Sequence, residues 1–232
     1  MPASQPTGLL SQKQQRGKFF YLFFTQILLI TLFPYLAKPG LPTILLRLLS
    51  AASFLAAVYA VSERRAQRIT ASVLVVPTVV LNLASALRPG LQIAIPAMIA
   101  TLLFMAFTLV SLLRAVLRSE TISPDTIYGA LSVYLLMAFA WGVAYLLLET
   151  LHPGTLSLDS VRHPNHKIDW DDCMFYSFVT ITSTGYGDMV PVTAQGRSLS
   201  VLEAVSGMMY VAVLIARLVG IYSTTNRSLS RD

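Results

Sequence analysis

A short polar run with two glycines, Thr182-Ser183-Thr184-Gly185-Tyr186-Gly187-Asp188, lies between two long apolar segments in the second half of the 232-residue chain. Glycine has no Cβ and adopts backbone conformations closed to other residues, so successive carbonyl groups beside it can point the same way. Rings of such carbonyls, contributed by several copies of a loop, can replace the hydration shell of a cation. Because ordinary turns also use Gly-x-Gly, the assignment depends on the flanking segments.

The segment before this run, Trp170 to Thr182, is apolar and suited to a helix, but it is too short to span a membrane. Asp171 and Asp172 at its start complement the positive end of the helix dipole, while the carbonyl end favours a cation. Irregular backbone at membrane depth is tolerated only where protein or water surrounds it. We therefore predict a re-entrant helix followed by an ion-coordinating loop.

The composition is typical of a membrane protein. Hydrophobic residues make up 55% of the chain and charged residues 12%, against about 25% charged residues in soluble domains. The net charge of +6 fits basic residues that flank membrane segments, and no basic-aromatic array indicates a nucleic-acid partner. The single cysteine, Cys173, cannot form an intrachain disulfide. We expect membrane lipids as neighbours, no nucleic acid and no cofactor.

Six near-continuous apolar runs are each long enough to cross the roughly 30 Å of a bilayer core as a helix. They lack the two-residue alternation of a barrel strand, and in lipid only helices and closed barrels satisfy every backbone group. The predicted spans are Phe19–Ala37, Pro42–Val61, Ile69–Leu87, Leu91–Leu117, Thr126–Glu149 and Arg197–Ser223. The predicted fold is all-α, with the short helix and the glycine run between the fifth and sixth spans.

Basic residues set the predicted orientation. They gather in the segments 1–18, 62–68, 114–125 and 227–232. Cytosolic loops carry an excess of lysine and arginine, so both ends of the chain are predicted to lie in the cytosol. The glycine run then faces the outside.

From Thr126 to Ser223, the order of long helix, short helix, Thr-x-Thr-Ser-Thr-Gly-Tyr-Gly-Asp-x-x-Pro and second long helix resembles the pore of the tetrameric potassium channel superfamily. The resemblance implies a homotetramer, because each chain carries one filter loop and the pore needs four. It also implies a channel of the bacterial type with six membrane helices, placed in the inner (plasma) membrane. Potassium would be the permeant ion.

The resemblance also assigns roles to the residues of the glycine run. Backbone carbonyls of four consecutive residues would line the potassium sites, with one hydroxyl at the inner site. These residues are Ser183, Thr184, Gly185 and Tyr186, and the hydroxyl is that of Ser183. Gly187 would allow the last turn, while Thr182 and Asp188 would support the two ends of this selectivity filter.

Four positions differ from the usual pattern of the superfamily. Ser183 and Thr184 stand where threonine and valine are usual, which keeps a hydroxyl at the inner site and changes the packing behind the filter. Phe175 and Tyr176, further supports of the filter, replace the paired tryptophans of many voltage-gated members. A weakly selective monovalent cation channel therefore stands as an alternative to a potassium-selective one.

The fourth span lacks the arginines that voltage-gated relatives carry at every third residue to respond to the membrane field. Arg114 and Arg118 appear only at its inner end, where long side chains reach the interface. A strongly voltage-gated channel is therefore not expected. The predicted division is a cytosolic tail (1–18), a sensor-like four-helix module without gating charges (19–118), a pore domain (119–226) and a short cytosolic tail (227–232), with no cytosolic regulatory domain.

Three further residues of the pore domain are candidates for a role in the site. Glu203 is an acid within an apolar helix, which marks a functional position by default, and we predict that it supports the filter. Glu149 either ties the fifth span to the filter surround or is an exposed interfacial acid. Gly207 resembles the hinge glycine of inner pore helices, and close helix packing explains it equally well.

The predicted function is passive, potassium-selective conduction through a tetrameric central pore, with a nonconducting membrane scaffold or regulatory subunit as a second alternative. An enzyme is not expected, because no span carries a cluster of histidine, aspartate and glutamate like a catalytic or metal site.

Overall fold

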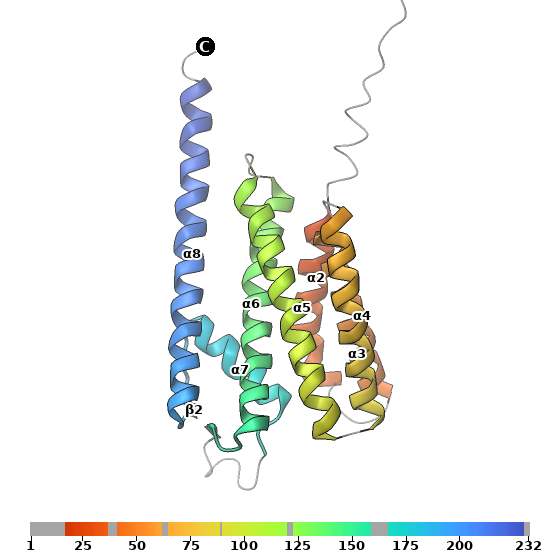
Figure 1. The fold of residues 1–232 in the computed structure, drawn as a ribbon. Helices are drawn as coiled ribbons and strands as arrows, with labels where there is room; N and C mark the ends of the chain where they lie inside the picture. Colours follow the sequence, from red (N-terminus) through yellow and green to blue (C-terminus); the bar gives the residue numbers. More distant parts are fainter. Residues whose placement is uncertain are drawn as a thin grey trace, which may run out of the picture.

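The computed structural model describes residues 17–36, 41–61, 65–88, 90–119, 123–158 and 167–229. Within these ranges the protein is a bundle of long helices with one short helix and a two-stranded ribbon (Figure 1). The helices are α2 (Lys18–Leu36), α3 (Leu41–Val61), α4 (Arg65–Leu87), α5 (Leu91–Arg118), α6 (Pro124–Leu151), α7 (Trp170–Ile181) and α8 (Ala194–Leu229); the strands are β1 (Leu156–Leu158) and β2 (Met189–Pro191).

The six long helices coincide with the six predicted spans, and α7 coincides with the predicted short helix. Within the described residues, α4, α5, α6 and α8 are long and apolar enough to cross a membrane, whereas the apolar stretches of α2 and α3 are shorter. The count of six spans therefore stays a prediction. α8 runs past its predicted end at Ser223 to Leu229, so the segment 227–232 begins within a helix.

Helices α2, α3, α4 and α5 pack side by side and contact α6 through α2 and α5 (Figure 1). Polar side chains join these apolar helices at a few points. The Asn82 side-chain amide donates to the Thr101 hydroxyl (3.0 Å) and joins α4 to α5. The Gln26 amide donates to the backbone carbonyl of Ser132 (3.3 Å) and joins α2 to α6. Such interhelical hydrogen bonds supply association energy that the hydrophobic effect does not supply in lipid.

Helix α6 lies between the first four helices and the rest of the chain. Its N-cap is Ser123, whose hydroxyl accepts a hydrogen bond from the backbone N–H of Thr126 (3.1 Å), and Pro124 occupies the first turn. Serine is a favoured N-cap residue, and proline suits the first helical turn. Because α6 contacts α2, α5, α7 and α8, it connects the two parts of the molecule.

Strands β1 and β2 form an antiparallel ribbon that was not predicted. Leu156 pairs with Pro191 and Leu158 pairs with Met189. The backbone N–H of Val192 also donates to the carbonyl of Thr155 (2.9 Å). The ribbon therefore fastens the chain that follows the glycine run to the chain that follows α6.

Helix α8 stands at one side of the molecule, and it contacts α6, α7 and β2 (Figure 1). Large apolar side chains are exposed along much of its length. They include Val201, Leu202, Met208, Met209 and Ile215. A contiguous apolar surface of this size marks contact with lipid or with another protein.

Candidate functional site

Helix α7 begins with a capping box that the sequence analysis missed. The Asp169 carboxylate accepts from the backbone N–H groups of Asp171 (2.9 Å) and Asp172 (3.3 Å), and the Asp172 carboxylate accepts from the N–H of Asp169 (2.9 Å). The Asp-x-x-Asp spacing is the sequence signal for this arrangement. Burial, followed by the charges of Asp169 and Asp172, raises the pKa of Asp171 to about 6.

The chain turns tightly at the other end of α7. The N–H of Ser183 donates to the carbonyl of Thr180 (3.0 Å), and the N–H of Thr184 donates to the carbonyl of Val179 (2.9 Å). The Thr182 hydroxyl donates to the carbonyl of Phe178 (2.7 Å) and lies 2.8 Å from the Thr184 hydroxyl. These bonds hold the glycine run against the carbonyl end of α7.

The backbone of the glycine run alternates in hand. The dihedral φ is positive at Ser183 (57°), Gly185 (57°) and Gly187 (79°), whereas Thr184 and Tyr186 between them are not in that region. Alternation of hand gathers the N–H groups on one side of a segment and leaves the carbonyls to the other. For Ser183 the left-handed conformation costs about 1–2 kcal/mol, and strain of this kind is concentrated at functional sites.

The outer end of the run is exposed in the single chain. The Tyr186 side chain is 70% exposed, and its ring stacks on that of Phe175, with centroids 6.2 Å apart and an interplanar angle of 8°. The Asp188 carboxylate accepts from the N–H of Met189 (3.0 Å), at the start of β2. Residues 182–187 are all exposed, so the chain by itself covers little of the run.

Behind α7, the Glu203 side chain is fully buried and joins three helices. Its carboxylate accepts from the Tyr145 hydroxyl of α6 (2.6 Å) and from the Ser177 hydroxyl of α7. The Ser177 hydroxyl also lies 2.7 Å from the carbonyl of Ala138. The sequence singled out Glu203, but its partners on α6 and α7 carry no sequence signal, because serine and tyrosine are common in membrane helices.

Tyr176 and Glu149 reinforce the same region. The Tyr176 hydroxyl lies 2.7 Å from that of Ser200 on α8, and the Tyr176 ring packs edge-on against that of Tyr145. The Glu149 carboxylate accepts from the backbone N–H groups of Gly154 (2.7 Å) and Leu156 (3.0 Å). Glu149 thereby orders the loop that leads into β1, and through the ribbon it acts on the chain beyond the glycine run.

Gly207 lies where α8 crosses the end of α7. A Cβ at this position would lie 2.7 Å from the carbonyl oxygen of Ile181 and 2.6 Å from its Cγ1. The Ile181 carbonyl is also held by the hydroxyl of Tyr134 (3.0 Å), so it cannot retreat without the loss of that bond. The close packing of α8 against the end of α7 therefore explains why position 207 is a glycine. A hinge role for Gly207 stays a prediction.

Replacing Gly207 with alanine is expected to destabilise each subunit by about 1–3 kcal/mol, the usual cost of overpacking, and to reduce ion flux by displacing the end of α7. Thermal unfolding in detergent and flux in liposomes measure the two effects. Gly220→Ala is the matched control on the same helix, since a Cβ there meets nothing within 4 Å. If Gly207→Ala kept stability and altered only the opening kinetics, the hinge role would be the correct one.

Arg217, on the C-terminal part of α8, donates to the carbonyls of Val116 and Ser119 (2.6 Å to Ser119) at the end of α5. The contact satisfies carbonyls that the end of α5 leaves without intrahelical partners. It joins the first four helices directly to α8.

The described part of the chain holds no group of three or more histidine, cysteine, aspartate or glutamate side chains that could bind a metal ion. Cys173 is buried and free. The carbonyl and hydroxyl oxygens around the glycine run are hard ligands, which suit an alkali or alkaline-earth cation rather than a transition metal.

Comparison with known proteins gives a family match and several relatives. A family model described as an ion channel matches residues 126–223. The protein LctB of Bacillus caldotenax is 27% identical over 108 residues, which cover 44% of this chain and 75% of LctB. No solved structure matches the chain significantly.

Two further relatives carry a function in their names. The probable potassium channel protein 2 of Methanocaldococcus jannaschii is 40% identical over 55 residues, covering 22% of this chain and only 16% of that protein. The potassium channel protein kcv of Paramecium bursaria Chlorella virus 1 is 25% identical over 71 residues, covering 30% of this chain and 76% of that protein.

Proposed function

Since residues 126–223 belong to the ion channel family within the potassium channel superfamily, we propose that the protein is a passive, potassium-selective channel whose central pore is formed by four copies of the chain. The family indicates a transport protein rather than an enzyme. The membrane-capable helices agree with that reading.

The observation that carries the proposal is the backbone of residues 183–187. Its alternating hand, with positive φ at Ser183, Gly185 and Gly187, suits a segment whose carbonyls face one axis. Four such segments around that axis would offer rings of oxygens in place of the hydration shell of potassium. The carbonyls of Thr184 and Tyr186 would complete the row of sites, and the Ser183 hydroxyl would lie at its inner end.

Exposure in the single chain supports assembly into a tetramer. The Tyr186 ring and the glycine run have few covering residues, and α8 presents a long apolar surface. Neighbouring copies would cover both, because α8 lies beside the glycine run on the same side of the molecule (Figure 1). A pore lined by α8 would also place the carbonyl ends of four α7 helices toward its centre, where their partial negative charge favours a cation.

The orientation follows from the basic ends of the helices. α2 begins, and α5 and α8 end, at the upper end of the molecule in Figure 1, where Lys18, Arg114, Arg118 and Arg217 lie on the same three helices. By the excess of basic residues in the cytosol, we place this end inside the cell and the ribbon outside. The bacterial inner membrane is the proposed location.

Reconstitution of the purified chain in liposomes tests the function. With a potassium gradient across the membrane, we expect uptake of potassium and little uptake of sodium, and a particle with the mass of a tetramer in mild detergent. Absence of flux from well-folded tetramers would favour the nonconducting scaffold. A monomer would contradict the pore itself.

Reversal potentials in mixed potassium and sodium decide between the selective and the weakly selective channel. The Thr182 and Thr184 hydroxyls lie 2.8 Å apart, and in the proposed filter they would form a polar pair at the position where the superfamily usually has valine. We expect this pair to keep the filter ordered and the current selective. A reversal potential that follows sodium and potassium equally would assign the weakly selective channel.

A further inference from the structure

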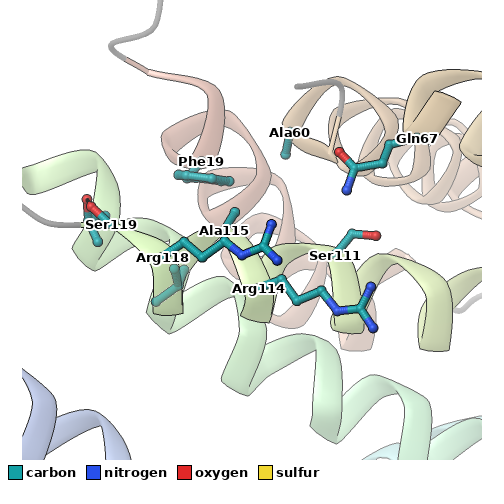
Figure 2. A pocket seen from close by; sticks show the side chains of 10 residues that line it. Phe19, Ala60, Gln67, Ser111, Arg114, Ala115, Arg118 and Ser119 are labelled. Carbon is teal, nitrogen blue, oxygen red and sulfur yellow. Dashed lines mark hydrogen bonds between the residues drawn. The ribbon is translucent and has the colours of Figure 1, made fainter. Parts of the chain in front are cut away.

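A second site lies at the end of the molecule opposite the ribbon. A cavity of about 330 Å³ opens there between α2, α3, α4, α5 and the start of α6 (Figure 2). This volume falls at the lower end of the range for small-ligand pockets, roughly 300–1,000 Å³. The cavity lies away from the glycine run and takes no part in the proposed conduction.

Two arginines give the cavity its charge. Arg114 and Arg118 are four residues apart on α5, which places them on one face of the helix, and both side chains are exposed. Figure 2 shows them extending from α5 in the same direction, toward the side where Gln67 and Ser111 lie. No acidic side chain among the described residues lines the cavity.

Within the part of the chain that the structure describes, the nearby charged groups leave the cavity positive. The Asp125 carboxylate is directed to the start of α2, where it accepts from the N–H of Phe20 (3.4 Å). The Lys18 ammonium lies over the ring of Tyr59, 5.9 Å from its centroid, and adds a third positive charge near the rim, next to the lining residues Phe19 and Ala60. An anion entering the cavity therefore meets net positive charge.

Arginines at the end of a membrane helix often only extend to the membrane–water interface. Here, polar side chains from other helices line the same cavity as the two arginines. Gln67 of α4, Ser111, Ser119 and Thr126 line the same cavity, and the Ser119 and Thr126 hydroxyls lie 3.3 Å apart within this polar rim. A guanidinium presents paired N–H groups that match the oxygens of a phosphate. Two such groups beside an amide and several hydroxyls are suited to a phosphate rather than to a single carboxylate.

We propose that this cavity binds the phosphate of an anionic phospholipid from the inner leaflet. Basic pockets between membrane helices on the cytoplasmic side bind such headgroups, and the cavity lies at the ends of α2 and α5, at the depth of the headgroups. The inference rests on the proposed membrane orientation and not on ion conduction.

The cavity is connected to α8 by hydrogen bonds at the end of α5. Val116 and Ser119 line the cavity, and their carbonyls accept the hydrogen bonds from Arg217 of α8. A headgroup held by Arg114 and Arg118 orders the end of α5 and therefore the contact that joins it to α8. Anionic lipid would thus favour one position of α8 at its cytosolic end.

Native mass spectrometry of the purified full-length protein in mild detergent tests the site directly. We expect saturable binding of phosphatidylglycerol, one molecule per chain, and much weaker binding of phosphatidylcholine. Arg114→Gln and Arg118→Gln should each weaken binding about fivefold, given roughly 1 kcal/mol for each basic residue near an anionic lipid surface. Arg114→Lys keeps the charge without the planar fork and should lose less than Arg114→Gln.

Two controls separate the cavity from general surface charge. Arg65→Gln removes an exposed charge at the start of α4, outside the cavity lining, and Arg88→Gln removes one at the other end of α4. Both should bind phosphatidylglycerol as the wild type does. Equal loss in all four glutamine variants, or none in the Arg114 and Arg118 variants, would overturn the proposal, as would displacement of the lipid by equimolar glycerol phosphate. Binding is read without flux, so this result is independent of the proposed channel function.

Discussion

Replacing Gly185 with alanine is expected to abolish potassium flux while leaving the chain folded. Gly185 has a φ of +57°, where an alanine costs about 1–2 kcal/mol and relaxes by rotating the neighbouring peptide units. The cost in stability is small, whereas the effect on function is large, because rotation turns the carbonyls of Thr184 and Gly185 away from the proposed axis. Flux into liposomes should fall to the level of liposomes without protein.

Gly17→Ala is the matched control for this variant. Gly17 also has a positive φ (+125°), and a Cβ there meets the Tyr21 side chain at an ordinary contact distance of 3.8 Å, but it lies just before α2, away from the glycine run. Its alanine variant should lose at least similar thermal stability and keep its flux. If both variants conducted normally, the carbonyls of the glycine run would not be the ion ligands.

The second large effect is expected at Glu203, where leucine should impair the channel and glutamine should be tolerated. A glutamine can accept from the Tyr145 hydroxyl and donate to the Ser177 oxygen, because the Ser177 proton can turn to the carbonyl of Ala138. A leucine has about the same volume and can do neither. We expect Glu203→Leu to lose about 1–3 kcal/mol per subunit, the cost of one buried polar group left unsatisfied.

Glu203→Leu should also disturb the proposed filter. The substitution removes the hydrogen bond between Ser177 of α7 and residue 203 of α8, and α7 leads directly into the glycine run. Thermal unfolding of the purified protein and the ratio of potassium to sodium flux measure the two consequences. Ser206→Ala is the control, since among the described residues the Ser206 hydroxyl donates only to the carbonyl of Glu203 within α8 (2.8 Å). Equal damage from Glu203→Gln and Glu203→Leu would mean that the negative charge, rather than hydrogen bonding, is what the site requires.

The helices were predictable because each depends on a local property of the sequence. An unbroken apolar run predicted α5 and α6 to within a few residues. Helix α7 was recognisable because it is apolar, too short to span, and followed by the glycine run. None of these predictions required knowledge of which segments meet in space.

The features that were missed depend on contacts between distant segments. The ribbon joins residues that are more than 30 positions apart, and three-residue strands leave almost no alternation to detect. The bonds from Arg217 to the end of α5, like those from Glu203 to Tyr145 and Ser177, join side chains whose proximity only the packing of the helices decides. For Ser183, positive φ was unexpected, because sequence reasoning reserves that region for glycine.

The packing of α2 and α5 against α6 of the same chain has a consequence for assemblies that mix altered and normal chains. Only residues 119–123 connect α5 to α6, and five residues span at most about 18 Å. Helices α2 to α5 therefore pack against α6 of their own chain and not against that of a neighbouring copy. If four chains assemble as proposed, a defect in α2 to α5 of one chain would weaken that subunit alone, and the damage would grow with the number of altered subunits. In the proposed tetramer, a defect in the glycine run would instead distort rings shared by all four chains, so that a cell producing both altered and normal chains would lose most of its conduction.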